Sequence, residues 1–121
     1  MFNEEELMDE GNVNKIIRLY RAVGFNEYIS LIESETFQIL KGGVAVKYFG
    51  KNFTETLIFA SKPINNGIVA IFEIGIDEND LLNIGDFINV DKFIFKSGTV
   101  EIQEEHLEEF NNAILYIKHI Y

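Results

Sequence analysis

The sequence lacks cysteine entirely and is poor in basic residues. Without cysteine the chain has no disulfide, no thiolate metal ligand and no cysteine nucleophile. Ten Lys and Arg stand against 20 Asp and Glu, which gives a formal net charge of −10. A field of this sign repels phosphate backbones and anionic lipid head groups, so we expect binding neither to nucleic acid nor to a membrane surface.

Long hydrophobic runs are also missing. No window approaches the roughly 18 uninterrupted apolar residues that are needed to span a bilayer. The first residues, Met-Phe-Asn-Glu-Glu-Glu, lack the basic start and the apolar stretch of a signal peptide. We therefore expect a cytoplasmic protein.

The chain nevertheless has the material for a hydrophobic core. Of its 121 residues 47% are hydrophobic, and 11 are Phe and 5 are Tyr. This length encloses one core and is too short for two, so residues 1–121 are predicted to form a single domain. Residues 1–14 concentrate acid without a stable apolar stripe, which indicates a tail or a frayed helix.

Hydrophobic periodicity predicts an α+β fold with a mixed, mainly antiparallel sheet of about six strands. The expected strands are residues 15–23, 36–40, 44–49, 68–76, 93–96 and 99–102. Two hairpin turns are expected, at Lys41-Gly42-Gly43 and at Ser97-Gly98, and the strand at 68–76 is expected in the middle of the sheet.

Two or three short helices and one long helix are expected beside this sheet. The short helices follow the capping residues Asn26, Asn52 and Asp77, and Pro63 stops the second of them. The long C-terminal helix rests on apolar residues at spacings of 3 and 4, namely Leu107, Phe110, Ile114, Ile117 and Tyr121.

Arg21 is the most informative single residue. Alternation along the strand at 15–23 places Arg21 in a row with Leu19 and Val23 on an apolar face. A guanidinium is almost never buried unpaired, so Arg21 either reaches solvent or meets a carboxylate or an anionic ligand. Glu73 likewise places a charge in the otherwise apolar strand at 68–76. Arg21 and Glu73 could pair if their two strands are neighbours.

The sequence does not predict a metal site. Asp77, Asn79 and Asp80 lack the glycine and the closing glutamate of a calcium loop, so helix capping explains them better. His106 and His119 lie 13 positions apart on one expected helix, about 20 Å along its axis, and cannot share a ligand.

Four segments, taken in order, resemble small ADP-ribosyltransferase-like domains. They are LYRAV at 19–23, KYF at 47–49 before the helix at 53–60, GIVAIFEIGI at 67–76 and GTVEIQEEHLEEFN at 98–111. The resemblance implies that Arg21 on the first strand and Tyr48 on a middle strand hold a nicotinamide dinucleotide, NAD, as cofactor. It also implies that Glu101 on a late strand stabilises the oxocarbenium-like centre as nicotinamide leaves.

The sequence differs from that family pattern at two points. Phe49-Gly50-Lys51-Asn52 stands where many members have Ser-Thr-Ser, and Thr99 stands two positions before Glu101 where protein-modifying members carry Glu or Gln. By strand alternation alone Glu101 faces solvent.

A second function remains open beside the first. The acidic surface would steer a basic partner protein toward this one, as in a non-catalytic binding module of the immunity or antitoxin type. A catalytically degenerate member of the same fold would satisfy both hypotheses. The sequence leaves the oligomeric state open, because the C-terminal apolar stripe could face a second subunit as easily as its own sheet.

Overall fold

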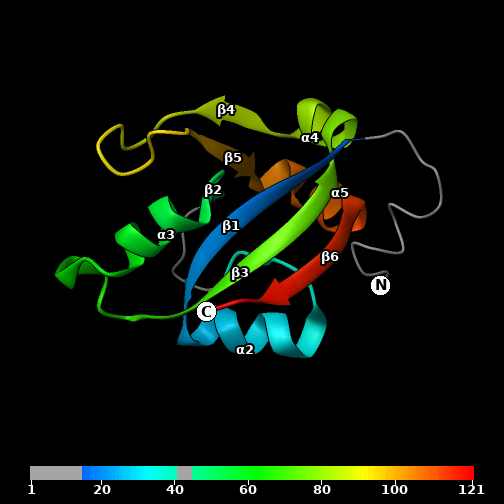
Figure 1. Ribbon diagram of the computed structural model, residues 1–121. Helices are drawn as coiled ribbons and strands as arrows, with labels where there is room; N and C mark the ends of the chain where they lie inside the picture. Colours follow the sequence, from blue (N-terminus) through cyan, green and yellow to red (C-terminus); the bar gives the residue numbers. More distant parts are fainter. Residues whose placement is uncertain (1–14, 41–44) are drawn as a thin grey trace.

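The computed structural model describes residues 15–40 and 45–121. Their centre is a six-stranded sheet with the strand order β4-β5-β2-β1-β3-β6 (Figure 1). The strands are β1 (Ile16–Gly24), β2 (Val46–Gly50), β3 (Ile68–Asp77), β4 (Asp86–Ile88), β5 (Thr99–Gln103) and β6 (Ile114–His119). The α+β class is confirmed. The sheet was predicted to be mixed and mainly antiparallel, but every neighbouring pair of its described strands is antiparallel.

The described helices are distributed over both faces of the sheet. They are α2 (Phe25–Ser34), α3 (Phe53–Ala60), α4 (Glu78–Ile84) and α5 (Leu107–Ala113), with short 3₁₀ turns η1 (Pro63–Asn65) and η2 (Glu104–His106). Apolar residues of α2, α4 and α5, among them Leu31, Leu81 and Phe110, join one core with Leu19 of β1 and Ile74 of β3. We call the side of the sheet that bears this core the core face.

Helix α3 covers part of the opposite face. Its Phe53 ring lies 6.0 Å from that of Tyr20 on β1. Its Thr56 packs so close to Gly50 of β2 that a methyl group at Gly50 would overlap the threonine hydroxyl. The glycine at position 50 therefore lets the helix approach the sheet.

The sheet is weakly joined between β1 and β2. Strand β1 pairs with β3 along its whole length, from Ile16 to Gly24. Among the described residues, β1 and β2 are in register only where Tyr20 lies opposite Gly50. Beyond that pair the two strands are no longer held together by a ladder, and we call this region the β1–β2 junction.

Several local predictions are confirmed. Asn52 caps α3, because its side-chain oxygen accepts a hydrogen bond of 3.0 Å from the backbone N–H of Glu55. Asp77 caps α4 in the same way, with a bond of 2.9 Å from the backbone N–H of Asn79. Helix α3 ends before Pro63, as predicted. Strand β3 is paired on both sides and largely buried, but the prediction that it lies in the middle of the sheet is wrong, because β1 and β2 occupy that place.

The prediction of a long C-terminal helix is wrong. Helix α5 ends at Ala113, and residues 114–119 instead form β6, the second neighbour of β3. The pairing shifts between Gly75 and Ile76, so β6 has one extra residue at this bulge. A bulge places Ile114 and Ile117, three positions apart, on the same core face, and this spacing imitates that of a helix.

Two predicted strands are also absent. Residues 36–40 are irregular, because the side chain of Asn111 takes the place of a neighbouring strand and bonds the backbone N–H and C=O of Phe37, at 2.8 Å each. Residues 93–96 form turns in which the Asp91 carboxylate accepts from the backbone N–H of Phe93 at 3.1 Å. The partner of β5 on that side is β4, which is too short to be seen in a periodicity.

The predicted cap at Asn26 is wrong as well. Strand β1 continues to Gly24 and α2 begins at once with Phe25, so Gly24 occupies the cap position without a side-chain hydrogen bond. The predicted turn at residues 41–43 and the tail at residues 1–14 lie outside the described residues. No helix in the described part of the chain is long and apolar enough to cross a membrane.

Candidate functional site

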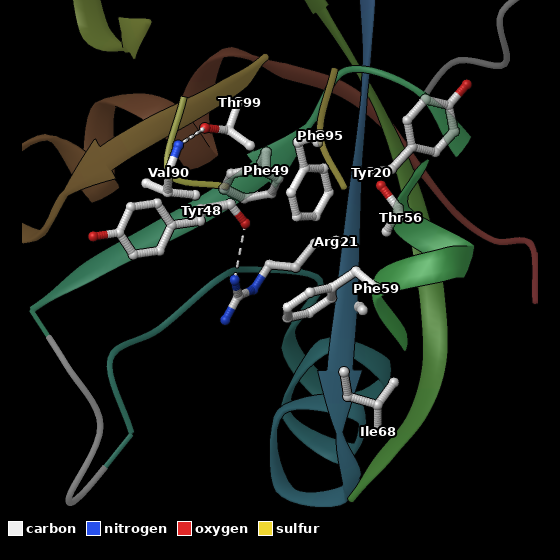
Figure 2. Close-up of a pocket in the computed structure, with 12 residues that line it drawn as sticks. Tyr20, Arg21, Tyr48, Phe49, Thr56, Phe59, Ile68, Val90, Phe95 and Thr99 are labelled. Carbon is white, nitrogen blue, oxygen red and sulfur yellow. Dashed lines mark hydrogen bonds between the residues drawn. The ribbon is translucent and has the colours of Figure 1, made fainter. Parts of the chain in front are cut away.

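A cavity of about 280 Å³ lies at the β1–β2 junction, on the side that α3 covers. Figure 2 shows the side chains that surround it, among them the rings of Phe59 on α3 and Phe95, whose centroids lie 5.4 Å apart. Its walls come from β1, β2, α3, the start of β3 and the connection between β4 and β5. Its lining is mainly aromatic and aliphatic, which is the usual character of a small-molecule site.

Two threonine hydroxyls line this cavity. The Thr56 hydroxyl donates to the backbone carbonyl of Asn52 at 3.0 Å, and the Thr99 hydroxyl donates to that of Ile88 at 2.6 Å. Each hydroxyl has therefore used its only proton. The Thr99 oxygen already accepts a hydrogen bond of 3.5 Å from the backbone N–H of Val90, so each oxygen keeps at least one lone pair for a ligand. The cavity thus combines aromatic walls with hydrogen-bond acceptors.

A buried charged cluster of Arg21, Glu27 and Lys47 occupies the core face of the same junction. The Arg21 Nε and Nη2 atoms donate to the two carboxylate oxygens of Glu27, at 2.6 and 2.9 Å. The Lys47 Nζ donates to the Glu27 Oε1 at 2.9 Å. The exposed fractions of these three side chains are 19%, 11% and 7%, so two cations share one carboxylate with little access to water.

Burial and pairing act against each other on the pKa values of this cluster. Burial favours a higher pKa for Glu27, but hydrogen bonds and charge attraction from Arg21, and then from Lys47, outweigh it and lower the pKa below its ordinary value. The pKa of Lys47 is also lowered, first because burial disfavours its ammonium form, although the hydrogen bond to Glu27 opposes this.

The cluster identifies the partner of Arg21. Arg21 lies on the core face as predicted, and its carboxylate partner is Glu27 at the start of α2. Glu73 cannot take this role, because it lies opposite Tyr20 and thus on the other face. There Glu73 accepts a hydrogen bond of 2.8 Å from the Tyr116 hydroxyl and lies 4.0 Å from the Arg18 guanidinium.

The family resemblance singled out Arg21, Tyr48 and Glu101. These residues lie on β1, β2 and β5, which are adjacent strands of the sheet. Arg21 crosses the junction and donates to the backbone carbonyl of Tyr48 at 2.9 Å (Figure 2). Both residues line the cavity. Three of the five guanidinium N–H groups are engaged within the protein, which leaves two for a ligand.

Glu101 lies further from the cavity than Tyr48. It is the direct cross-strand partner of Tyr48, and both side chains are on the face away from the core. Its carboxylate accepts a hydrogen bond from the side-chain amide of Gln103, two positions along the same strand. Glu101 is adjacent to the residues that line the cavity without being one of them.

Sequence reasoning missed Glu27 and Lys47. A signal for Lys47 was present, because Lys47 alternates with Phe49 in a predicted strand and so places a second cation on an apolar row. Glu27 carried no comparable signal, since a glutamate in the first turn of a helix is ordinary. In the described part of the chain, no group of three or more Asp, Glu or His side chains could hold a metal ion.

The sequence and the structure were compared with protein-family models, with curated proteins and with solved structures. None of the three comparisons finds a match to this chain.

Proposed function

We propose that the cavity at the β1–β2 junction is the binding site of an ADP-ribosyltransferase-like domain for a nicotinamide dinucleotide. One observation carries the proposal. Arg21 and Tyr48, which the family resemblance assigned to the cofactor from sequence alone, line the same cavity from neighbouring strands. A polar ligand can enter a sheet there because the backbone ladder between the strands is interrupted.

The chemistry of the cavity suits one end of such a ligand. A nicotinamide ring is planar and carries an amide N–H₂, which matches aromatic walls and the acceptor oxygens of Thr56 and Thr99. A volume of about 280 Å³ takes a ring of this size and not the whole dinucleotide. The pyrophosphate would lie outside the cavity, and the two remaining N–H groups of Arg21 provide a charge-assisted contact for it.

Glu101 would act on the sugar next to the ring. A carboxylate fixed by its neighbour can offset the positive charge that develops as nicotinamide leaves. The amide of Gln103 holds the Glu101 carboxylate, and both side chains lie on the same face as Tyr48. Their arrangement supports a role in cleavage or transfer for Glu101.

A specific observation favours the alternative of a non-catalytic binding module. Glu27 already satisfies Arg21 through two hydrogen bonds, so the guanidinium has less need of an anionic ligand. In that case the domain is a degenerate member of the fold, and its acidic surface engages a basic partner protein. The partner would bind with an affinity that falls steeply with salt, and NAD would not bind.

Isothermal titration calorimetry with NAD separates the two functions. For the wild type we expect a measurable Kd. Arg21→Ala should weaken NAD binding roughly tenfold or more, because a hydrogen bond to a charged group is worth about 1.5–3 kcal/mol. Tyr48→Ala should weaken it by roughly two- to tenfold, because an aromatic ring contact is worth about 0.5–1.5 kcal/mol. Arg18→Ala is the matched control, because Arg18 lies on the same strand and does not line the cavity. Glu101→Gln should retain NAD binding and lose NAD cleavage by roughly 100-fold.

The folding of each variant is checked by circular dichroism. Tyr48 is 38% exposed, so its truncation tests the site even if Arg21→Ala weakens the fold. If the wild type gives no heat at millimolar NAD, the catalytic proposal is wrong and the binding-module alternative remains.

A further inference from the structure

Two chain connections lie beside the cavity and carry exposed apolar and basic side chains. They are residues 61–67, between α3 and β3, and residues 89–98, between β4 and β5 (Figure 1). Helix α3 is attached to the second connection by Glu55, whose carboxylate accepts from the Ser97 hydroxyl at 2.7 Å, and by the rings of Phe59 and Phe95, 5.4 Å apart. The two connections are thus held on the same helix.

Each connection presents an apolar side chain to solvent. Phe93 is 92% exposed and Ile64 is 90% exposed, which makes them the two most exposed large apolar side chains of residues 15–40 and 45–121. Val90, which also lines the cavity, is half exposed. Large apolar side chains that stay in contact with water on segments next to a cavity are typical of a binding surface.

The charge of this region is opposite to that of the whole chain. Four of the ten basic residues lie here and are exposed, namely Lys51, Lys62, Lys92 and Lys96. Lys51 is placed beside the second connection, where its side chain lies next to Gly98. The same segments contain two acidic residues, Glu55 and Asp91, which bond Ser97 and the backbone of the 92–94 turn, so the lysines outnumber the carboxylates by four to two. We call the three apolar residues and the four lysines the two-loop surface.

From this combination we infer that the two-loop surface docks an acidic segment of another protein, which also presents an apolar side chain. Carboxylates of the segment would meet the lysines, and its apolar side chain would pack against the exposed apolar side chains of the two connections. Charge complementarity of this kind raises the rate of encounter and fixes the orientation of a partner. The inference goes beyond the proposed function and does not depend on NAD binding.

An acidic protein segment fits this surface better than a nucleic acid does. The net charge of −10 repels a long phosphate backbone, whereas a short segment places its charge only where the lysines are. Exposed Phe93 and Ile64 also favour an apolar side chain over a sugar-phosphate chain. The partner differs from the basic protein that the overall charge suggests, because a local field governs contacts within about 10 Å at ordinary salt.

Selection from a random twelve-residue peptide library displayed on phage tests the inference with the full chain. On the wild type we expect enrichment of peptides that combine Asp or Glu with an aromatic residue or Leu. Their synthetic versions should bind at least tenfold more weakly to Lys92→Glu/Lys96→Glu and to Ile64→Ser/Phe93→Ser. Ile32→Ser on α2 and Lys15→Glu before β1 are matched controls, because both residues are exposed and lie on other segments.

Three results would overturn the inference. They are a selection without enrichment or with basic sequences, equal affinity for the wild type and the two double variants, and displacement of the peptides by a twelve-nucleotide single-stranded DNA at lower concentration than by the peptides themselves. All four replaced residues are exposed, so the variants keep their fold, which circular dichroism verifies. Peptide binding in a protein that gives no heat with NAD would contradict the proposed function and leave this inference standing.

Discussion

At the scale of single residues, the Arg21, Glu27 and Lys47 cluster is the most consequential feature of the molecule. Two cations and one carboxylate are removed from water beneath the β1–β2 junction. The attraction within such a group offsets the loss of hydration only while every member is present. The cluster therefore fixes Arg21 in the direction of Tyr48 and makes the junction sensitive to protonation of Glu27.

Replacement of Glu27 by Gln should destabilise the protein in a pH-dependent way. At pH 7 the substitution leaves two buried cations without their carboxylate, and breaking a buried pair costs about 3–5 kcal/mol. Because the pKa of Glu27 is lowered in the folded state, its charge stabilises the fold above the unfolded pKa of about 4.5, and this stabilisation is lost as the pH falls through the folded value. The difference between wild type and Glu27→Gln should therefore narrow below about pH 4.5.

Urea denaturation at a series of pH values measures this difference. Glu33→Gln is the matched control, because Glu33 lies on the same helix and is exposed. It should change the free energy of unfolding by less than about 0.5 kcal/mol at any pH. A Glu27→Gln variant whose deficit stayed constant from pH 7 to pH 3 would show that Glu27 does not act through its charge.

At the scale of helices and strands, the capping contact at its first turn decides where a helix begins. Asn52 and Asn26 look alike in the sequence, since each precedes an apolar periodic stretch. Only Asn52 occupies a cap position, where it accepts from the backbone N–H of Glu55. Asn26 already lies inside the first turn of α2, because β1 runs directly into that helix.

The two asparagines make a matched pair for mutagenesis. Asn52→Ala should lower the free energy of unfolding by about 1 kcal/mol, since it removes the partner of an unsatisfied helical N–H group. Asn26→Ala should change it by only a few tenths of a kcal/mol and can stabilise α2 slightly, because alanine has the higher helix propensity. Thermal or chemical denaturation measures both. An equal loss in the two variants would mean that Asn26 has a capping role after all.

At the scale of the whole molecule, the net charge of −10 opposes the compact state through self-repulsion. Screening of this repulsion by sodium chloride should raise the thermal midpoint at pH 7, by about 4 °C for each kcal/mol gained. Near the sequence isoelectric point of about 4.5 the same salt should have little effect, because the net charge is then small. Scanning calorimetry at both pH values tests this. A midpoint that fell with salt at pH 7 would show that attractive surface pairs outweigh the repulsion.

The sequence by itself determined much of the local structure. Alternating or continuous apolar residues located β1, β2, β3 and β5, and side chains that can cap a helix located the starts of α3 and α4. It also established that Arg21 stands on an apolar face and needs a partner. These features depend on interactions between residues close in the chain, which periodicity and capping chemistry report directly.

Only the tertiary structure decided which distant residues meet. The choice of Glu27 over Glu73 follows from the β1–β3 register, which turns Glu73 to the opposite face. Residues 114–119 form a strand because they pair with the free edge of β3. A bulge in this pairing lets apolar residues three positions apart, a spacing typical of a helix, lie on one face of a strand. Lys47 joined the cluster, and the cavity formed, because β1 and β2 separate beyond Tyr20 and Gly50. Pairing between strands far apart in the chain is set by packing and burial over the whole fold, which no window of sequence contains.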